Sequence, residues 1–193
     1  MNCLIIAAGH GSRLRAVSDS KPLTRVAGTA MIERIVRAAA AGGATAFTVV
    51  TGHQAERVEA FLDELAARTG LSIRAVRTQD WDRPNGYSVL SGADAIEGDY
   101  LLTMSDHLFA PAIVRALIAA QSDAGVTLAV DRDLANPLLD MDDATKVAVA
   151  DDGAIVRIGK TLERFDAIDT GLFRATPSLA EAIRAAIADG GAG

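Results

Sequence analysis

The chain has 193 residues, enough for one domain with a sizeable core, and 50% of its residues are hydrophobic. Its 25 acidic residues outnumber its 19 basic ones, and the resulting net charge of −6 argues against nucleic-acid or anionic-membrane partners. The single cysteine, Cys3, cannot form an internal disulfide, so we expect it in the core of a cytoplasmic protein. The N-terminal apolar run is too short for a signal peptide, and no segment approaches the ~20 apolar residues of a membrane span.

Strand-like and helix-like patterns alternate along the first two thirds of the chain. Apolar or β-branched runs predict strands at 4–8, 46–51, 72–77, 100–104 and 126–130. Apolar residues at helical spacing predict helices around 31–42, 58–70, 87–96 and 110–121. This alternation predicts an α/β fold of three layers (α/β/α, Rossmann-like), with helices on both faces of a mixed, mostly parallel sheet. Ligands in such sheets bind at the carboxyl ends of the strands.

The last third of the chain has a different pattern. Two short alternating runs, at 145–150 and 154–159, flank Asp151-Asp152-Gly153, which is typical of a β-hairpin. A strand at 168–173 and an alanine-rich helix at 178–188 are expected to follow. Lys146 and Lys160 lie on or just beyond the hairpin strands, where solvated surface lysines are the ordinary alternative to a binding role.

The first strand-like run ends in a glycine-rich turn, Gly9-His10-Gly11-Ser12-Arg13. Backbone N–H groups at such a turn form a concavity for anionic oxygens, and Arg13 and Lys21 bring positive charge to it. The third glycine of the dinucleotide fingerprint and the Gly-Lys-Ser/Thr of the Walker loop are both absent. The residues predict a phosphate-binding cradle of another type, and the alternative is a turn that only joins a strand to a helix.

A second candidate site follows the strand at 100–104. Asp106 stands at the expected carboxyl end of this strand, where its carboxylate could hold Mg²⁺ together with substrate phosphates. The alternative is that Asp106 caps the next helix or forms a turn. His107 has no zinc-ligand spacing with the other two histidines, so we expect a positioning residue or a plain surface residue.

A polar loop between these motifs offers groups suited to a nucleoside. Gln79, Asn85 and Ser88 carry hydrogen-bonding side chains, and Gly86 allows close approach of the backbone. We expect Asn85-Gly86 to form a turn. An ordinary surface loop is the alternative, and Trp81 is compatible with either packing or stacking.

These motifs together resemble the nucleotidyltransferases, and in particular the CTP:inositol-1-phosphate cytidylyltransferase domain. The segments that carry the resemblance fall in the family's order over nearly the full length: AAGHGSRL, KPL, NGYS, LLTMSDHLF, DATKV, IGK and DTGLF. The length predicts a single domain over residues 1–193. The resemblance implies CTP as donor and inositol 1-phosphate, a phosphorylated polyol, as acceptor. The sequence does not determine the oligomeric state, and a homodimer is compatible with it. In many relatives this domain is fused to a membrane synthase.

The resemblance also implies roles for individual residues. Ala8, Gly9, Gly11 and Ser12 would hold the nucleotide, and Arg13 and Lys21 would act in catalysis by neutralising the triphosphate. The nucleoside would be read by Gln79, Asn85, Gly86 and Ser88. Asp106 would bind Mg²⁺, and the acceptor would meet Lys146, Lys160 and Asp169.

Two departures from the family pattern stand out. Ser20 precedes Lys21 where relatives often have proline, and the Trp-x-Asp-x-Asp-Thr-Pro segment that supplies a second metal carboxylate is absent. A truncated chain, substitution by Asp169, and incomplete activity all remain open. The alternatives to the inositol activity are a cytidylyl- or uridylyltransferase for another phosphorylated alcohol, phosphonate or sugar, and a non-catalytic nucleotide-binding protein.

Overall fold

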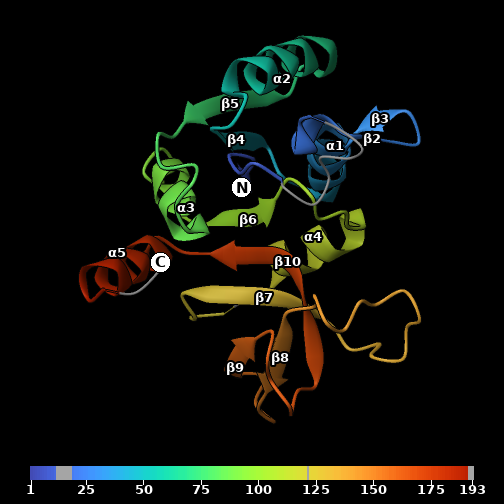
Figure 1. Ribbon diagram of the computed structural model, residues 1–193, viewed down its shortest axis with the longest axis vertical. Coiled ribbons are helices and arrows are strands. Elements are labelled where there is room, and N and C mark those ends of the chain that lie inside the picture. The colour runs from blue at the N-terminus through green and yellow to red at the C-terminus, as the bar shows by residue number, and fades with distance from the viewer. Residues whose placement is uncertain (12–18, 121, 191–193) are drawn as a thin grey trace.

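The centre of the molecule is a mixed β-sheet with helices on both sides (Figure 1). The computed structural model describes residues 1–11, 19–120 and 122–190. Within these ranges eight strands form the main sheet, in the order β5-β4-β1-β6-β10-β8-β9, and β7 pairs with the outer side of β10. None of the helices in the same ranges is long and apolar enough to cross a bilayer.

Four parallel strands form one half of the sheet: β1 (Asn2–Ile6), β4 (Ala46–Thr51), β5 (Ser72–Arg77) and β6 (Tyr100–Met104). β1 lies between β4 and β6, in a register that aligns the carboxyl ends of the three strands. The loops that follow these strands therefore meet at one edge of the sheet. This half confirms the strands that the apolar runs predicted, although β1 begins and ends two residues earlier than the predicted strand at 4–8.

The other half of the sheet is antiparallel and depends on one long strand, β10 (Ala167–Ala175). The second part of β10 pairs with β6, and its first residues pair with β8 (Lys146–Val149), which forms a hairpin with β9 (Ile155–Gly159). β7 (Val126–Asp131) covers the opposite edge of β10, with a register shift between Asp169 and Phe173. The predicted hairpin is thus confirmed, and β10 joins it to the parallel half.

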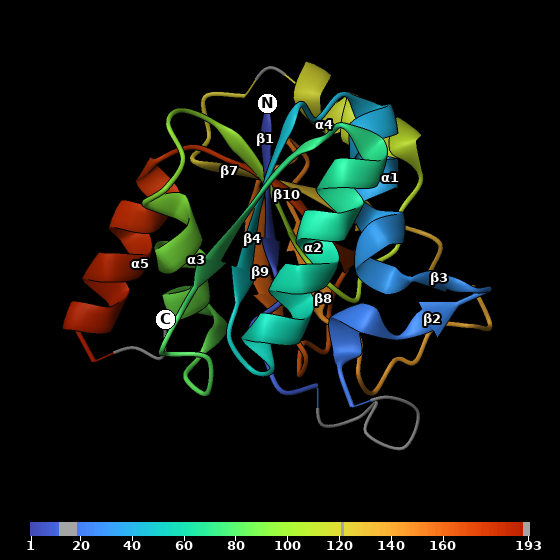
Figure 2. The same ribbon diagram turned by 90° about the horizontal axis from the view of Figure 1, so that it is seen from above.

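The helices form two layers (Figure 2). On one face lie α1 (Met31–Gly42), α2 (Ala55–Thr69) and α4 (Pro111–Ala119). On the other lie α3 (Asn85–Ala93) and α5 (Ser178–Ala188). This arrangement confirms the predicted α/β/α architecture.

The apolar periodicity of the helices explains which side they bury. In α1, Ile32, Ile35 and Val36 lie on one stripe and are fully buried against the sheet. Cys3 of β1 belongs to the same core, where burial raises the pKa of its thiol to about 12. The expected structural role of this cysteine is therefore confirmed.

A short connection joins the N-terminal turn to α1. It contains the 3₁₀ helix η2 (Lys21–Leu23) and a two-stranded ribbon of β2 (Arg25–Val26) and β3 (Thr29–Ala30). Pro22 is buried at the start of η2, a position where its fixed φ suits the first helical turn. This anchors the neighbouring Lys21 beside the carboxyl end of β1.

Candidate functional site

The end of β1 and the start of η2 form the first part of the site. Ala8 is fully buried, and Gly11 has a left-handed backbone with φ of +63°. A β-carbon at residue 11 would lie 2.6 Å from Cβ of Lys21, so the lysine side chain packs directly on the glycine. Gly9 has no neighbouring heavy atom within 4 Å of its would-be β-carbon. Ser12 and Arg13, which were expected in this cradle, lie outside the described residues.

Asp106 follows β6 and connects the cradle to the second motif. Its carboxylate forms an ion pair with the Lys21 ammonium and a 2.8 Å hydrogen bond with Nδ1 of His107. Burial by itself would raise the pKa of Asp106, but the contacts with His107 and Lys21 outweigh it and hold this pKa well below the usual range. The structure therefore brings Gly11, Lys21 and Asp106 together in one place at this edge of the sheet.

Asp169 lies on β10, close to the same centre. Its carboxylate accepts a 2.6 Å hydrogen bond from the backbone N–H of Gly171, and the His107 ring packs on that glycine. Burial raises the pKa of Asp169, against opposing contributions from Gly171 and His107. Sequence reasoning did not single out Gly171, although a glycine inside an apolar strand pattern can mark a bulge or a close approach.

The two candidate acceptor lysines lie near each other on the hairpin. Lys146 pairs with Ile168 in the β8–β10 ladder, next to Asp169, and its ammonium donates a 2.9 Å hydrogen bond to the carbonyl of Lys160. The Lys160 ammonium forms a 2.5 Å ion pair with Asp143. Lys146 is thus placed beside the Asp169 strand, whereas the charge of Lys160 is already paired.

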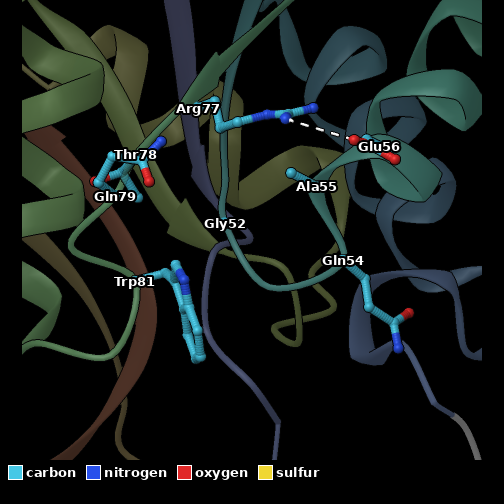
Figure 3. Close-up of a pocket in the computed structure, with 8 residues that line it drawn as sticks. All are labelled: Gly52, Gln54, Ala55, Glu56, Arg77, Thr78, Gln79 and Trp81. Carbon is cyan, nitrogen blue, oxygen red and sulfur yellow. Dashed lines mark ion pairs between the residues drawn. The ribbon is translucent and has the colours of Figure 1, made fainter.

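On the other side of β1, a cavity of about 330 Å³ opens between the loops that follow β4 and β5 (Figure 3). Gln79 and Trp81 line one side of it, and Gly52 lies between them and α2. Arg77 points toward Glu56 across the opposite wall, with 4.0 Å between the charged atoms. Of the four residues predicted to read the nucleoside, Gln79 is the one that lines this cavity.

Three aromatic rings connect the cradle to this cavity. His10 lies edge-on to His53, with 4.1 Å between ring centroids, and Trp81 lies 5.4 Å from His53. The backbone N–H of His53 donates to the Ala8 carbonyl at 2.9 Å. Trp81 keeps 36% of its surface exposed, so it can contact a ligand as well as pack.

The remaining nucleoside candidates occupy the start of α3. Asn85 and Gly86 do not form the isolated turn that their sequence suggested, because Pro84 supplies an extended entry and the helix begins at Asn85. Gly86 and Ser88 are buried in the first turns of α3. α3 packs on β1 and β4.

The oxygen ligands that magnesium would need are present. Mg²⁺ in phosphoryl-transfer sites is held by one or two carboxylates and by substrate phosphates rather than by a cage of protein ligands. Asp106 is ionised and Asp169 lies in its vicinity, since His107 contacts both Asp106 and Gly171. Within the described parts of the chain no cluster of three or more potential metal ligands occurs. These residues fit Mg²⁺.

Comparison with known proteins places this chain in a family. Residues 3–192 match the family of MobA-like NTP transferase domains. The "Bifunctional IPC transferase and DIPP synthase" of Rubrobacter xylanophilus is 38% identical over 94% of the chain, and the protein of that name from Archaeoglobus fulgidus is 32% identical over 94%. The chain spans only 40% and 34% of the lengths of these two relatives.

The fold has a close structural counterpart. The inositol-1-phosphate CTP transferase from T. maritima superposes with a TM-score of 0.83 at 24% identity, covering 94% of this chain and 74% of that one. At this identity the likeness bears on the fold. The match over residues 3–192 shows that the chain belongs to the MobA-like NTP transferase domains and is a member of a nucleotidyltransferase enzyme family.

Proposed function

We propose that this protein transfers CMP from CTP to inositol 1-phosphate, giving CDP-inositol and pyrophosphate. The observation that carries the proposal is the contact of Lys21 with both Gly11 and Asp106, which joins the N-terminal glycine-rich turn to the motif after β6. The relatives named IPC transferase and the fold of the T. maritima enzyme support the choice of donor and acceptor. Lys146, which lies beside the Asp169 strand, supports a phosphorylated acceptor there.

The proposed reaction needs no general base. The acceptor phosphate monoester has a second pKa near ~6 and is largely dianionic at neutral pH. One of its oxygens attacks the α-phosphorus of CTP, and a new P–O bond forms. The bond from that phosphorus to the bridging oxygen breaks, and pyrophosphate leaves with the electron pair. Two anions must approach each other, so positioning and charge stabilisation dominate the barrier.

Each group of the site has a place in this scheme. Lys21, with Arg13, offsets the charge that develops on the leaving pyrophosphate. Asp106 and Asp169 are the groups that would hold Mg²⁺, which when bound neutralises phosphate charge. Gln79 and Trp81 take the base, and Lys146 and Lys160 take the acceptor phosphate. For Lys160 this requires exchange of its ion pair with Asp143 for the substrate.

The test is pyrophosphate release with Mg²⁺ and inositol 1-phosphate, measured with each of the four ribonucleoside triphosphates. We expect release with CTP only, dependent on the acceptor, and a product with the mass of CDP-inositol. Release with a different triphosphate or acceptor would support nucleotidyl transfer but show that the proposed substrates are wrong. Binding of CTP without release from any pair would contradict the proposed activity.

A further inference from the structure

His107 contacts two strands at once. Its Nδ1 forms the 2.8 Å hydrogen bond with Asp106 at the end of β6, and its ring lies on Gly171 in β10. Gly171 in turn donates its backbone N–H to the Asp169 carboxylate at 2.6 Å. The two carboxylates of the site are thus linked through one imidazole and one glycine.

The fit between His107 and Gly171 is tight. A β-carbon at residue 171 would lie 2.3 Å from Cδ2 and 2.5 Å from Nε2 of the ring, closer than any side chain can be. Gly171 also has a left-handed backbone with φ of +70°, and the β7–β10 register shifts between Asp169 and Phe173. Strand β10 therefore bends where the ring lies against it, and the bend carries Asp169.

The geometry assigns a role to these contacts that rests on the function proposed above. We propose that His107 is a positioning residue which fixes the separation of the Asp106 and Asp169 carboxylates, so that both can hold one divalent cation. The hydrogen bond orients Asp106, and the packing on Gly171 keeps the bend of β10, and with it Asp169, in place. Groups that orient metal ligands commonly change metal affinity 10- to 100-fold when they are removed.

Two substitutions separate the two contacts. His107→Asn keeps a short polar side chain that can donate to Asp106 but removes the ring from Gly171. His107→Phe keeps a ring against Gly171 but removes the hydrogen bond. If both contacts are needed, each variant weakens Mn²⁺ binding about tenfold, in line with other metal-ligand supports. Binding is measured by electron paramagnetic resonance with CTP present, and Asp123→Asn, an exposed carboxylate elsewhere, is the matched control.

A stability cycle tests the packing without activity or metal. Gly171→Ala should lower Tm by about 3 °C or more in the wild-type background, through the clash and the positive φ. In the His107→Ala background the clash is gone, so the same substitution should cost clearly less. Equal costs in the two backgrounds would show that the ring does not hold β10.

The outcomes separate this inference from the proposed function. Weakened Mn²⁺ binding in both single variants, with a non-additive stability cycle, supports the positioning role even if inositol 1-phosphate is not the acceptor. Wild-type Mn²⁺ affinity in either His107→Asn or His107→Phe would overturn it. A wild-type protein that binds CTP and Mn²⁺ but forms no CDP-inositol would overturn the proposed substrates alone.

Discussion

The Lys21 side chain lies across the open face of Gly11, where a β-carbon would come within 2.6 Å of the lysine Cβ and 2.9 Å of its Cδ. Glycine is therefore required at position 11 for two reasons: the backbone has a positive φ, and Lys21 occupies the space that a side chain would fill. From this position the lysine ammonium meets Asp106. Gly11 thus helps to fix the position of the Lys21 ammonium.

The first prediction concerns this contact. Gly11→Ala should lower both Tm and kcat/KM, because the new methyl group strains the backbone and displaces Lys21. Gly28→Ala is a matched control, since Gly28 also has a positive φ, of +81°, but nothing lies within 4 Å of its would-be β-carbon. Each substitution carries the backbone cost of about 1–2 kcal/mol, and Gly11→Ala should lose about 1–3 kcal/mol more by overpacking. Equal losses in denaturant unfolding would contradict the contact.

The second prediction tests the charge of Lys21. Lys21→Met keeps the alkyl chain on Gly11 but removes the ammonium, so kcat should fall about a hundredfold, as when one preorganised electrostatic group is lost. Arg57→Met removes an exposed positive charge from α2 and is expected to keep wild-type turnover. Near-normal turnover of Lys21→Met, measured by pyrophosphate release, would remove Lys21 from the catalytic groups.

The third prediction concerns Asp106 and pH. Its folded-state pKa lies below the unfolded value of about 3.9, so the ionised group stabilises the fold above that pH, and this stability is lost as pH falls through the folded pKa. Asp106→Asn should therefore lower Tm at pH 7, and the difference from wild type should shrink below about pH 4. A variant as stable as wild type at pH 7 would show that the contacts with Lys21 and His107 contribute no net stability.

The fourth prediction concerns Asp169, whose ionisation should affect stability in the direction opposite to that of Asp106. The pKa of Asp169 is raised by burial, so its ionised form destabilises the fold at neutral pH, and the penalty disappears as pH falls below the raised pKa. Asp169→Asn keeps an acceptor for the Gly171 N–H, and we expect Tm at pH 7 to rise by about 2 °C while turnover falls. Scanning calorimetry at several pH values checks this. A Tm difference that does not depend on pH would show that the buried charge of Asp169 does not destabilise the fold.

The fifth prediction uses the only tryptophan of the chain. Trp81 is partly exposed, lines the cavity with Gln79 and lies 5.4 Å from the His53 ring. Binding of CTP should therefore change its fluorescence, and Gln79→Ala should weaken the affinity read from the titration. If Trp81 fluorescence does not change at CTP concentrations that give the maximal rate of pyrophosphate release, the base binds outside this cavity.

Local sequence patterns were sufficient for most of the fold. The apolar run after Met1 and the alternation that follows it predict β1 and the parallel half, since each element shows its own period. The predicted turn at Asn85-Gly86 was wrong. This dipeptide is typical of turns, but Pro84 and the packing of α3 on β1 favour the start of a helix here. That choice is made by tertiary contacts, which a local pattern does not contain.

The candidate site also contains parts that the sequence predicts and parts that depend on tertiary contacts. Gly11, Lys21 and Asp106 follow from the motifs and from the rule that strand ends meet at one edge of a sheet. The contact of His107 with Gly171 joins segments far apart in the chain and depends on the bend of β10, so nothing in either segment indicates it. Likewise, the sequence does not show that Asp143 already pairs with Lys160.

Strand β10 has a consequence for how such enzymes can diverge. Its second part pairs with β6 through Leu172–Ala175, while its first residues, Ala167 and Ile168, hold the β8–β9 hairpin. Under the proposed function, the acceptor lysines belong to this hairpin, whereas the groups that bind the donor follow the parallel strands on the other side of the sheet. Mutations in the hairpin can then change which phosphorylated compound is accepted without disturbing the nucleotide-binding half. The fold thereby separates a donor-binding part from an acceptor-binding part that can vary on its own.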